Sequence, residues 1–213
     1  MQHLLVALDL SNFDTSNVTD MSGMFFETWN LQMLNISNFD TSKVQYMQWM
    51  FTDAWSLTSL DVSSFVTSNV TDMTGMFYQV SSITSLDVSN FNTANVESMD
   101  SMFYYVSSIT TLDVSNFNTS KVENMYQMFY AISLVTTLDV SGFDVSSVTE
   151  MSEMFKNAIN LATVHANGWD ITNAGTSSNV FSGAGYNISG GVTVYCDQGG
   201  SPGTGALFGK TCN

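Results

Sequence analysis

The sequence predicts an α/β fold built as a right-handed solenoid, in which each 26-residue repeat supplies one short parallel strand and one short helix or helical turn. The first observation behind this prediction is an aromatic residue that recurs every 26 residues without insertion or deletion. Its members are Phe13, Phe39, Phe65, Phe91, Phe117, Phe143 and then Trp169. Six near-identical repeats and a degenerate seventh therefore fill residues 1–181 as one solenoid. The other two observations are the apolar spacings inside a single repeat.

The first half of each repeat has the alternation of a half-buried strand. Within residues 85–91, the apolar Leu86 and Val88 alternate with Ser85, Asp87 and Ser89. Because successive side chains of a strand point to opposite faces, this pattern predicts one buried and one solvated face.

The second half of each repeat has the spacing of a helix. Within residues 120–129, Val122, Met125, Met128 and Phe129 lie three or four positions apart or adjacent. The segment also begins with a serine and a glutamate three positions apart, which is the pattern of a capping box. These features predict a short helix or a helical turn.

One such repeat cannot bury its apolar face alone, but stacked copies can. Parallel strands stack at roughly 4.8 Å, whereas a helix is roughly 10 Å wide, so the stack should curve unless the helical turns are short or tilted. The two methionine columns are then expected to fill the core, since flexible thioethers adapt to similar layers.

The recurring segments "LDLSNFDTSNVTDMSGMF" and "LDVSNFNTSKVENMYQMF" resemble the repeats of BspA-like leucine-rich-repeat surface proteins of bacteria, over residues 4 to about 160. The resemblance implies a leucine-rich-repeat-like solenoid displayed outside the cell, with adhesion or host binding as its role. Two departures stand out. The column where family members often carry a cysteine holds Thr, Ala, Val and Ile here. Phenylalanine occupies the column where leucine-rich repeats place an asparagine ladder, so horseshoe curvature is not assumed.

Residues 182–213 are predicted to cap the C-terminal end of the stack. They contain the chain's only two cysteines, Cys196 and Cys212, 16 positions apart. A disulfide between them would add about 3 kcal/mol and would point to an oxidising compartment; two free cytosolic thiols are the alternative. The N-terminal end shows no comparable cap, so end-to-end or side-by-side self-association is a further expectation.

The charge of the chain excludes some partners. Four basic residues stand against nineteen acidic ones, which gives a net charge of -15. Such a chain repels nucleic acid and anionic lipid surfaces. No apolar stretch reaches the roughly 18 residues of a membrane span. We expect an extracellular or cell-surface location, with any signal or anchor lying outside this chain.

The outward face of the strands carries the first candidate binding site. Its acidic column includes Asp61, Asp87, Asp113 and Asp139, and the serine column beside it includes Ser63, Ser89, Ser115 and Ser141. Like charges at roughly 5 Å repel one another, so either a ligand or hydrogen bonds from the serines should compensate. A cation, a sugar or a protein amine would suit this face. Calcium stays open as a ligand of this face, but no loop shows the dense alternating acids of a calcium-binding motif, so no cofactor is predicted.

A second candidate is aromatic. Tyr78, Tyr104 and Tyr130 share one column, which would suit a carbohydrate or protein contact. The alternative is that these rings pack over the edges of the core.

A third column consists of Thr15, Thr41, Thr67, Thr93 and Thr119. Stacked hydroxyls most often bond to nearby backbone and hold a turn, while an exposed lattice of them would suit ice.

The sequence offers few residues that could carry out catalysis. Only His3 and His165 could serve as general bases of the histidine type, and no phosphate loop, zinc spacing or nucleophile elbow accompanies them. The sequence therefore predicts a non-enzymatic surface module that binds a protein or carbohydrate on a host or neighbouring cell. A structural stalk and a carbohydrate- or ice-binding module are the alternatives.

Overall fold

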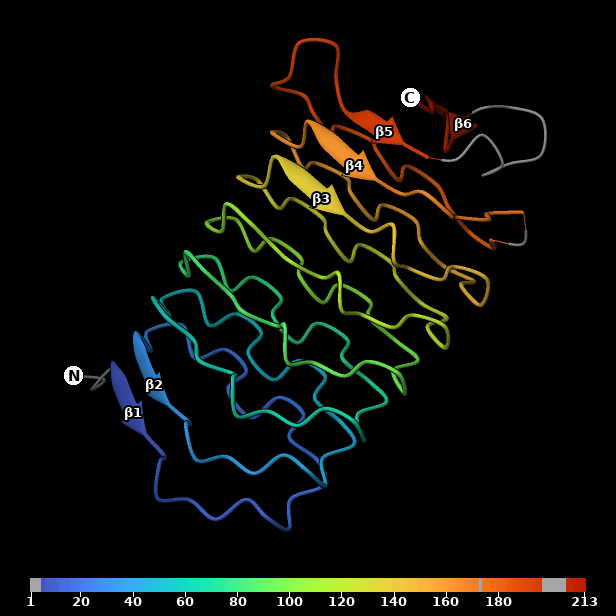
Figure 1. Ribbon diagram of the computed structural model, residues 1–213. Coiled ribbons are helices and arrows are strands. Elements are labelled where there is room, and N and C mark those ends of the chain that lie inside the picture. The colour runs from blue at the N-terminus through green and yellow to red at the C-terminus, as the bar shows by residue number, and fades with distance from the viewer. Residues whose placement is uncertain (1–4, 173, 197–205) are drawn as a thin grey trace.

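Successive repeats form coils that lie one upon another in chain order (Figure 1). The computed structural model describes residues 5–172, 174–196 and 206–213. We number the coils 1 to 7 by the residue at which each begins, namely 7, 33, 59, 85, 111, 137 and 163.

Short strands lie along one side of the stack, and all but the last two pair in parallel. β1 pairs with β2 so that Leu8 lies opposite Leu34, and β3 pairs with β4 so that Leu138 lies opposite Val164. Both registers equal one repeat, which keeps equivalent residues in adjacent layers. The strands are β1 (Ala7–Asp9), β2 (Met33–Asn35), β3 (Thr137–Asp139), β4 (Thr163–His165), β5 (Thr193–Tyr195), β6 (Ala206–Leu207) and β7 (Lys210–Thr211).

No helix occurs in the described part of the chain. Where the sequence predicts a short helix or a helical turn after each strand, the structure has a run of turns. In coil 1 the run covers residues 20–27, and its equivalents continue to residues 176–183 in coil 7; we call the whole set the turn ladder. The N–H groups of Met24, Phe26 and Thr28 each donate to the carbonyl three residues earlier. Overlapping turns of this kind bring positions three and four apart to one side, as a helix does.

The intervening N–H groups of the turn ladder bind the next coil. Met21, Gly23, Phe25 and Glu27 donate to carbonyls of coil 2 at 2.8–3.0 Å, and four such bonds recur at every interface up to coil 7. A helix would keep these donors within its own coil and would be too wide for the strand spacing. The stacking distance therefore selects turns over a helix.

The turn ladder needs two left-handed residues in each coil. In coil 1 they are Gly23 and Glu27, with φ of 61° and 56°. In the other coils these two positions are also left-handed, although most are not glycine. They are Trp49, Asp53, Gly75, Gln79, Ser101, Tyr105, Gln127, Ala131, Glu153, Asn157, Asn179 and Gly183.

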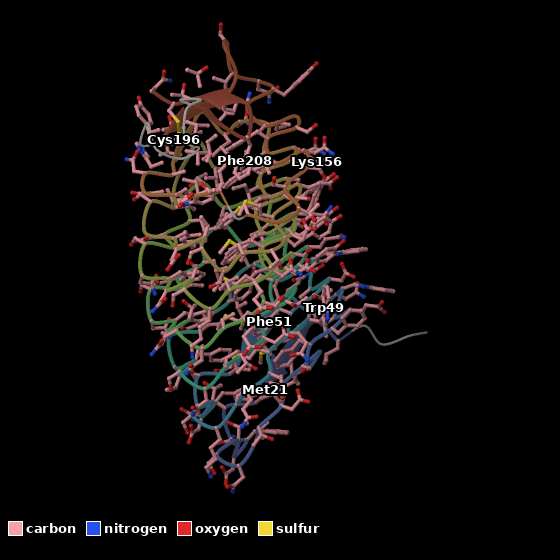
Figure 2. All side chains as sticks on the ribbon, turned by 90° about the vertical axis from the view of Figure 1, so that its right-hand side faces the viewer. Met21, Trp49, Phe51, Lys156, Cys196 and Phe208 are labelled. Atoms are coloured by element: carbon pink, nitrogen blue, oxygen red, sulfur yellow. A yellow bond between two sulfur atoms is a disulfide. The ribbon has the colours of Figure 1, made fainter. Side chains whose placement is uncertain are left out.

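The predicted apolar columns form the core. Phe51, Phe77 and Phe103 are fully buried, and their rings stack with centroids 5.7 Å apart. The methionine columns are buried from coil 2 onward, as their expected role as core filler requires. In coil 1 the core is open at its outer side, since Phe13 and Met24 are 57% and 40% exposed. Figure 2 shows the side chains along the stack, from Met21 near one end to Phe208 near the other.

Asparagine side chains tie neighbouring coils together, which the sequence analysis did not anticipate. The Nδ2 atom of Asn90 donates to the carbonyls of Val62 and Phe65, at 3.1 and 2.9 Å. Asn116 makes the equivalent bonds one coil later. The asparagine ladder therefore exists, one position before the buried phenylalanine column.

The C-terminal end carries a hairpin. β6 and β7 pair antiparallel, and Cys212 forms a parallel bridge with Val194 of β5. Cys196 and Cys212 form the predicted disulfide, with their Cα atoms 5.1 Å apart. The described part of the chain has no helix that is long and apolar enough to cross a membrane.

Candidate functional site

The acidic column lies on the outer side of the strands, which we call the strand face. Asp61, Asp87, Asp113 and Asp139 are all exposed, and so are Ser63, Ser89, Ser115 and Ser141. The structure thus brings the predicted aspartates and serines together, one pair to a coil.

Each aspartate holds the turn that follows it. The Oδ1 atoms of Asp61, Asp87 and Asp113 accept the N–H of the serine two residues later at 2.9–3.0 Å. Hydrogen bonds from the serine side chains and backbone lower the pKa of these carboxyls below its ordinary value. At Asp113, the neighbouring carboxylates Asp139 and Asp87 act in the opposite direction and raise the pKa. The hydrogen bonds from the serines therefore offset part of the repulsion between neighbouring carboxylates. Of the two kinds of compensation expected from the sequence, a ligand or hydrogen bonds from the serines, the structure shows the hydrogen bonds.

The strand face is hollowed where the sheet is open. A groove of about 570 Å³ crosses coils 3 to 6. Its lining residues are Leu60, Asp61, Ser85, Leu86, Asp87, Thr111, Leu112, Asp113, Thr137 and Asp139.

Backbone groups line the same groove without partners. Between β2 and β3, the described residues include no strand, although coils 3, 4 and 5 carry the same strand pattern. The backbone N–H groups of Leu60, Leu86 and Leu112 have no hydrogen bond in the structure. Water or a ligand must satisfy them, since unpaired backbone donors cost free energy. The groove combines repeated carboxylates with unused backbone N–H donors.

The tyrosine column packs against itself. Tyr104 lies between Tyr78 and Tyr130, with ring centroids 4.4 and 4.5 Å away and nearly parallel planes. Burial and the two neighbouring tyrosines raise the pKa of Tyr104 to about 12. The ring faces contact one another, so they are not free for a sugar to stack on. This arrangement favours the packing alternative for these residues.

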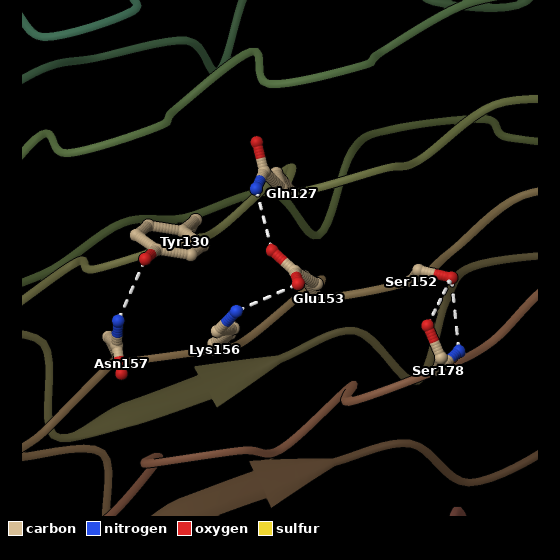
Figure 3. A network of polar contacts seen from close by, with 7 residues as sticks. All are labelled: Gln127, Tyr130, Ser152, Glu153, Lys156, Asn157 and Ser178. Carbon is tan, nitrogen blue, oxygen red and sulfur yellow. Dashed lines mark hydrogen bonds and ion pairs between the residues drawn. The ribbon is translucent and has the colours of Figure 1, made fainter.

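A polar network closes the tyrosine column at coil 6 (Figure 3). Asn157 Nδ2 donates to the Tyr130 hydroxyl at 2.8 Å, and Lys156 Nζ lies 5.8 Å from the centre of the Tyr130 ring. Glu153 accepts from Lys156 and from Gln127, each at 2.7 Å. The hydrogen bond from Lys156 is the main reason why the pKa of Glu153 is lowered. The network fixes these side chains.

The threonine column is buried between coils. Thr67 Oγ1 donates to the carbonyl of Asn92 at 3.0 Å and accepts its N–H at 2.8 Å. The same pair of bonds recurs at Thr15, Thr41 and Thr93. These hydroxyls hold turns, as expected, but they reach the next coil and are not exposed as a lattice.

His165 lies on β4, beside the disulfide end of the stack. Its ring stacks on Tyr195 at 4.9 Å, and its register partner on β3 is Asp139. His3, the other histidine, lies outside the described residues. Among the described residues, no three His, Cys, Asp or Glu side chains are grouped to hold a metal ion.

Comparison with known families gives one match. The family described as "Mycoplasma protein of unknown function, DUF285" matches residues 2–111 and again residues 80–190. The chain belongs to this family. The two overlapping matches fit a repeat that can be aligned in more than one register along the stack. Neither the comparison with curated proteins nor that with solved structures finds a match.

The sequence analysis missed two features of the site. The open sheet in coils 3 to 5 left no signal, since these coils share the strand pattern of the others. The turn-forming aspartates did leave a signal in the sequence. An aspartate or asparagine two residues before a serine recurs at a second position of the repeat. There Asp14, Asp40 and Asp144 accept the N–H of Ser16, Ser42 and Ser146.

Proposed function

We propose that the chain is a non-catalytic module of a secreted or cell-surface protein, and that its strand face binds a macromolecular ligand. The observation that carries this proposal is the groove of about 570 Å³, in which repeated carboxylates lie beside unpaired backbone groups. A ligand that carries amines at regular spacing would pair with the carboxylates, and its own carbonyl or hydroxyl oxygens would accept from the unpaired backbone N–H groups. Several weak, equivalent contacts would then act together through avidity.

The family relation and the disulfide support the location. The repeat resembles BspA-like surface repeats, and we extend the family assignment to a leucine-rich-repeat-like solenoid of that kind. The Cys196–Cys212 disulfide is typical of proteins in an oxidising compartment. The ice-binding and sugar-stacking alternatives have less support, because the threonines are buried and the tyrosine faces are occupied.

A triple substitution tests the strand face. Asp87→Asn, Asp113→Asn and Asp139→Asn together remove three charges from the groove. The fold should persist, because Asn35 already accepts the N–H of Ser37 at the equivalent position in coil 2. We expect the affinity for an octalysine probe, measured by calorimetry at physiological salt, to fall at least tenfold. Adhesion of protein-coated beads to cultured epithelial cells should fall with it.

A matched control carries the same charge change elsewhere. Asp14→Asn, Asp40→Asn and Asp144→Asn alter the second turn-forming column, whose carboxyls also accept a serine N–H. This triple variant should bind octalysine within about twofold of the parent, since only the total charge differs. Equal loss in both variants would show nonspecific attraction to an acidic protein. Unchanged adhesion of the strand-face variant, with an unchanged circular dichroism spectrum, would favour a structural stalk.

A further inference from the structure

The turn ladder ends at coil 7 with unused hydrogen-bond donors. Coil 6 donates four N–H groups to the carbonyls of Thr176, Ser178, Val180 and Ser182, at 2.8–2.9 Å. The equivalent donors of coil 7 are the N–H groups of Ser177, Asn179, Phe181 and Gly183. They have no acceptor among the residues that the structure describes. Their peptide groups point the same way as those of every coil below, so the aligned dipoles place partial positive charge along this edge.

The C-terminal hairpin covers only the other half of coil 7. Cys212 bridges to Val194 on the strand side, and Leu207 is fully buried over the core. The ring of Phe208 lies 6.3 Å from that of Phe181 and 6.5 Å from that of Trp169. Among the described residues, the hairpin thus supplies half of an eighth layer, and no second half lies above the turn ladder.

A recess of about 380 Å³ occupies that missing half. We call it the C-terminal notch. Its lining residues are Ser177, Asn179, Val180, Phe181, Ser182, Phe208 and Lys210. Lys210 forms no ion pair among the described residues, and it is one of only four basic residues in the chain. The notch therefore has a floor of backbone donors, one apolar wall and one positive charge.

We propose that the C-terminal notch binds a peptide segment of a partner protein, which runs parallel to residues 177–183 and offers a backbone carbonyl at every second residue. The spacing of the N–H donors favours a peptide chain as the ligand over a small anion. The four N–H groups are spread along seven residues, so one carboxylate or phosphate could meet only some of them. The chain itself fills such a row with a parallel segment at all six interfaces between its coils. Lys210 favours a segment that carries an acidic side chain.

A second copy of the chain fits the notch less well. Coil 1 has the complementary row, because the carbonyls of Asp20, Ser22, Met24 and Phe26 accept no hydrogen bond from the described part of the chain. Coil 1 is, however, a complete layer, and the hairpin already occupies the strand side and core side above coil 7. A docking coil would collide with the hairpin, whereas a single segment fills only the open half. The inference is independent of the strand face, which lies on a different side of the stack.

Amide hydrogen exchange, followed by NMR, tests the notch directly. The probe is a synthetic peptide of residues 72–80 (DMTGMFYQV), whose carbonyls at Asp72, Thr74, Met76 and Tyr78 accept this row of bonds within the stack. In the intact protein without peptide, the amides of Ser177, Asn179, Phe181 and Gly183 should exchange fast. Saturating peptide should slow all four at least tenfold, and a scrambled peptide should not.

A charge reversal supplies the second readout. Lys210→Glu should weaken binding of this acidic peptide about fivefold, as loss of one partly exposed ion pair predicts. Lys121→Glu makes the same charge change on coil 5, far from the notch, and should leave the affinity unchanged.

Each contrary outcome overturns the proposal in a distinct way. Amides that are already protected without peptide would show that the notch is filled. No protection at millimolar peptide would show that it binds no such segment. Full protection by acetate or phosphate alone would make it an anion site. Protection that rises with protein concentration, together with a dimer mass, would make the occupant a second copy. By contrast, loss of octalysine binding in the strand-face variant with notch protection intact would support the notch as a site separate from the strand face.

Discussion

A single serine interrupts the asparagine ladder. Asn38, Asn90 and Asn116 each donate from Nδ2 to a carbonyl of the preceding coil, whereas coil 3 has Ser64 at this position. The Ser64 hydroxyl is buried and has no hydrogen-bond partner. A serine is too short to span the distance that asparagine spans. The carbonyls of coil 2 that face Ser64 therefore lack the donor present in neighbouring coils.

Ser64→Asn should repair the ladder. The new amide would reach the carbonyls of Ile36 and Phe39, which correspond to Val62 and Phe65 beneath Asn90. We expect the free energy of unfolding to rise by about 1 kcal/mol, the typical net value of one hydrogen bond. Urea unfolding followed by circular dichroism measures the change. Asn90→Ser is the reverse substitution and should lower stability by a similar amount; a stabilising Asn90→Ser would contradict the ladder.

At the scale of the element, the turn ladder depends on left-handed backbone at two positions in each coil. Gly23 and Gly75 occupy the same position two coils apart, with φ of 61° and 58°. A Cβ added at Gly23 would meet nothing closer than 3.7 Å, but at Gly75 it would lie 2.1 Å from Cε3 of Trp49. The large indole thus lies directly over the glycine of the next coil.

The two glycines form a matched pair of substitutions. Gly23→Ala should cost about 1 kcal/mol, because alanine in a left-handed conformation is strained. Gly75→Ala should cost a further 1–3 kcal/mol or so, since Trp49 must move away. Thermal unfolding of both variants, alone and combined with Trp49→Ala, separates the cost of the left-handed backbone from the cost of the clash with Trp49. Equal costs in the Trp49→Ala background would confirm the steric cause, and equal costs in the parent would refute it.

The repeat length and the buried columns were predictable from the sequence, but the turn ladder was not. Met125, Met128 and Phe129 are buried at helical spacing, yet the chain around them forms turns. Apolar spacing reports only which side chains face inward, and overlapping turns place the same positions inward. The backbone conformation depends on the coil spacing, which arises from the neighbouring coils. Glycine at residues 23 and 75 was the one local sign against a helix.

The candidate site was predictable in its residues but not in its shape. Alternation within the strands placed Asp87 and Asp113 on the exposed face, where the structure has them. The groove beside them exists because coils 3 to 5 lack strand pairing, and their sequences match those of the paired coils. How far neighbouring strands separate is set by the stack as a whole, through the continuous hydrogen bonds of the turn ladder on the other side.

At the scale of the whole molecule, each coil contacts mainly its neighbours, so stability should vary along the stack. The central coils have both faces covered, whereas coil 7 depends on the hairpin. The hairpin is held by one bridge between Val194 and Cys212, by the burial of Leu207, and by the disulfide. Cys196 is 5% exposed, so the disulfide lies close to the core (Figure 2).

Reduction of the disulfide should therefore loosen one end and spare the rest. The bond closes a loop of 16 residues, which corresponds to about 3 kcal/mol of loop-closure free energy. Because this loop-closure free energy stabilises the hairpin, amides of β5 and coil 7 should exchange about a hundredfold faster after reduction. Amides of coils 3 to 5 should change little. Hydrogen exchange with and without a phosphine reductant measures both. A Cys196→Ala and Cys212→Ala variant should match the reduced protein without reductant. Uniform acceleration through all coils would instead show that the stack unfolds as a single cooperative unit, and that the disulfide stabilises every layer.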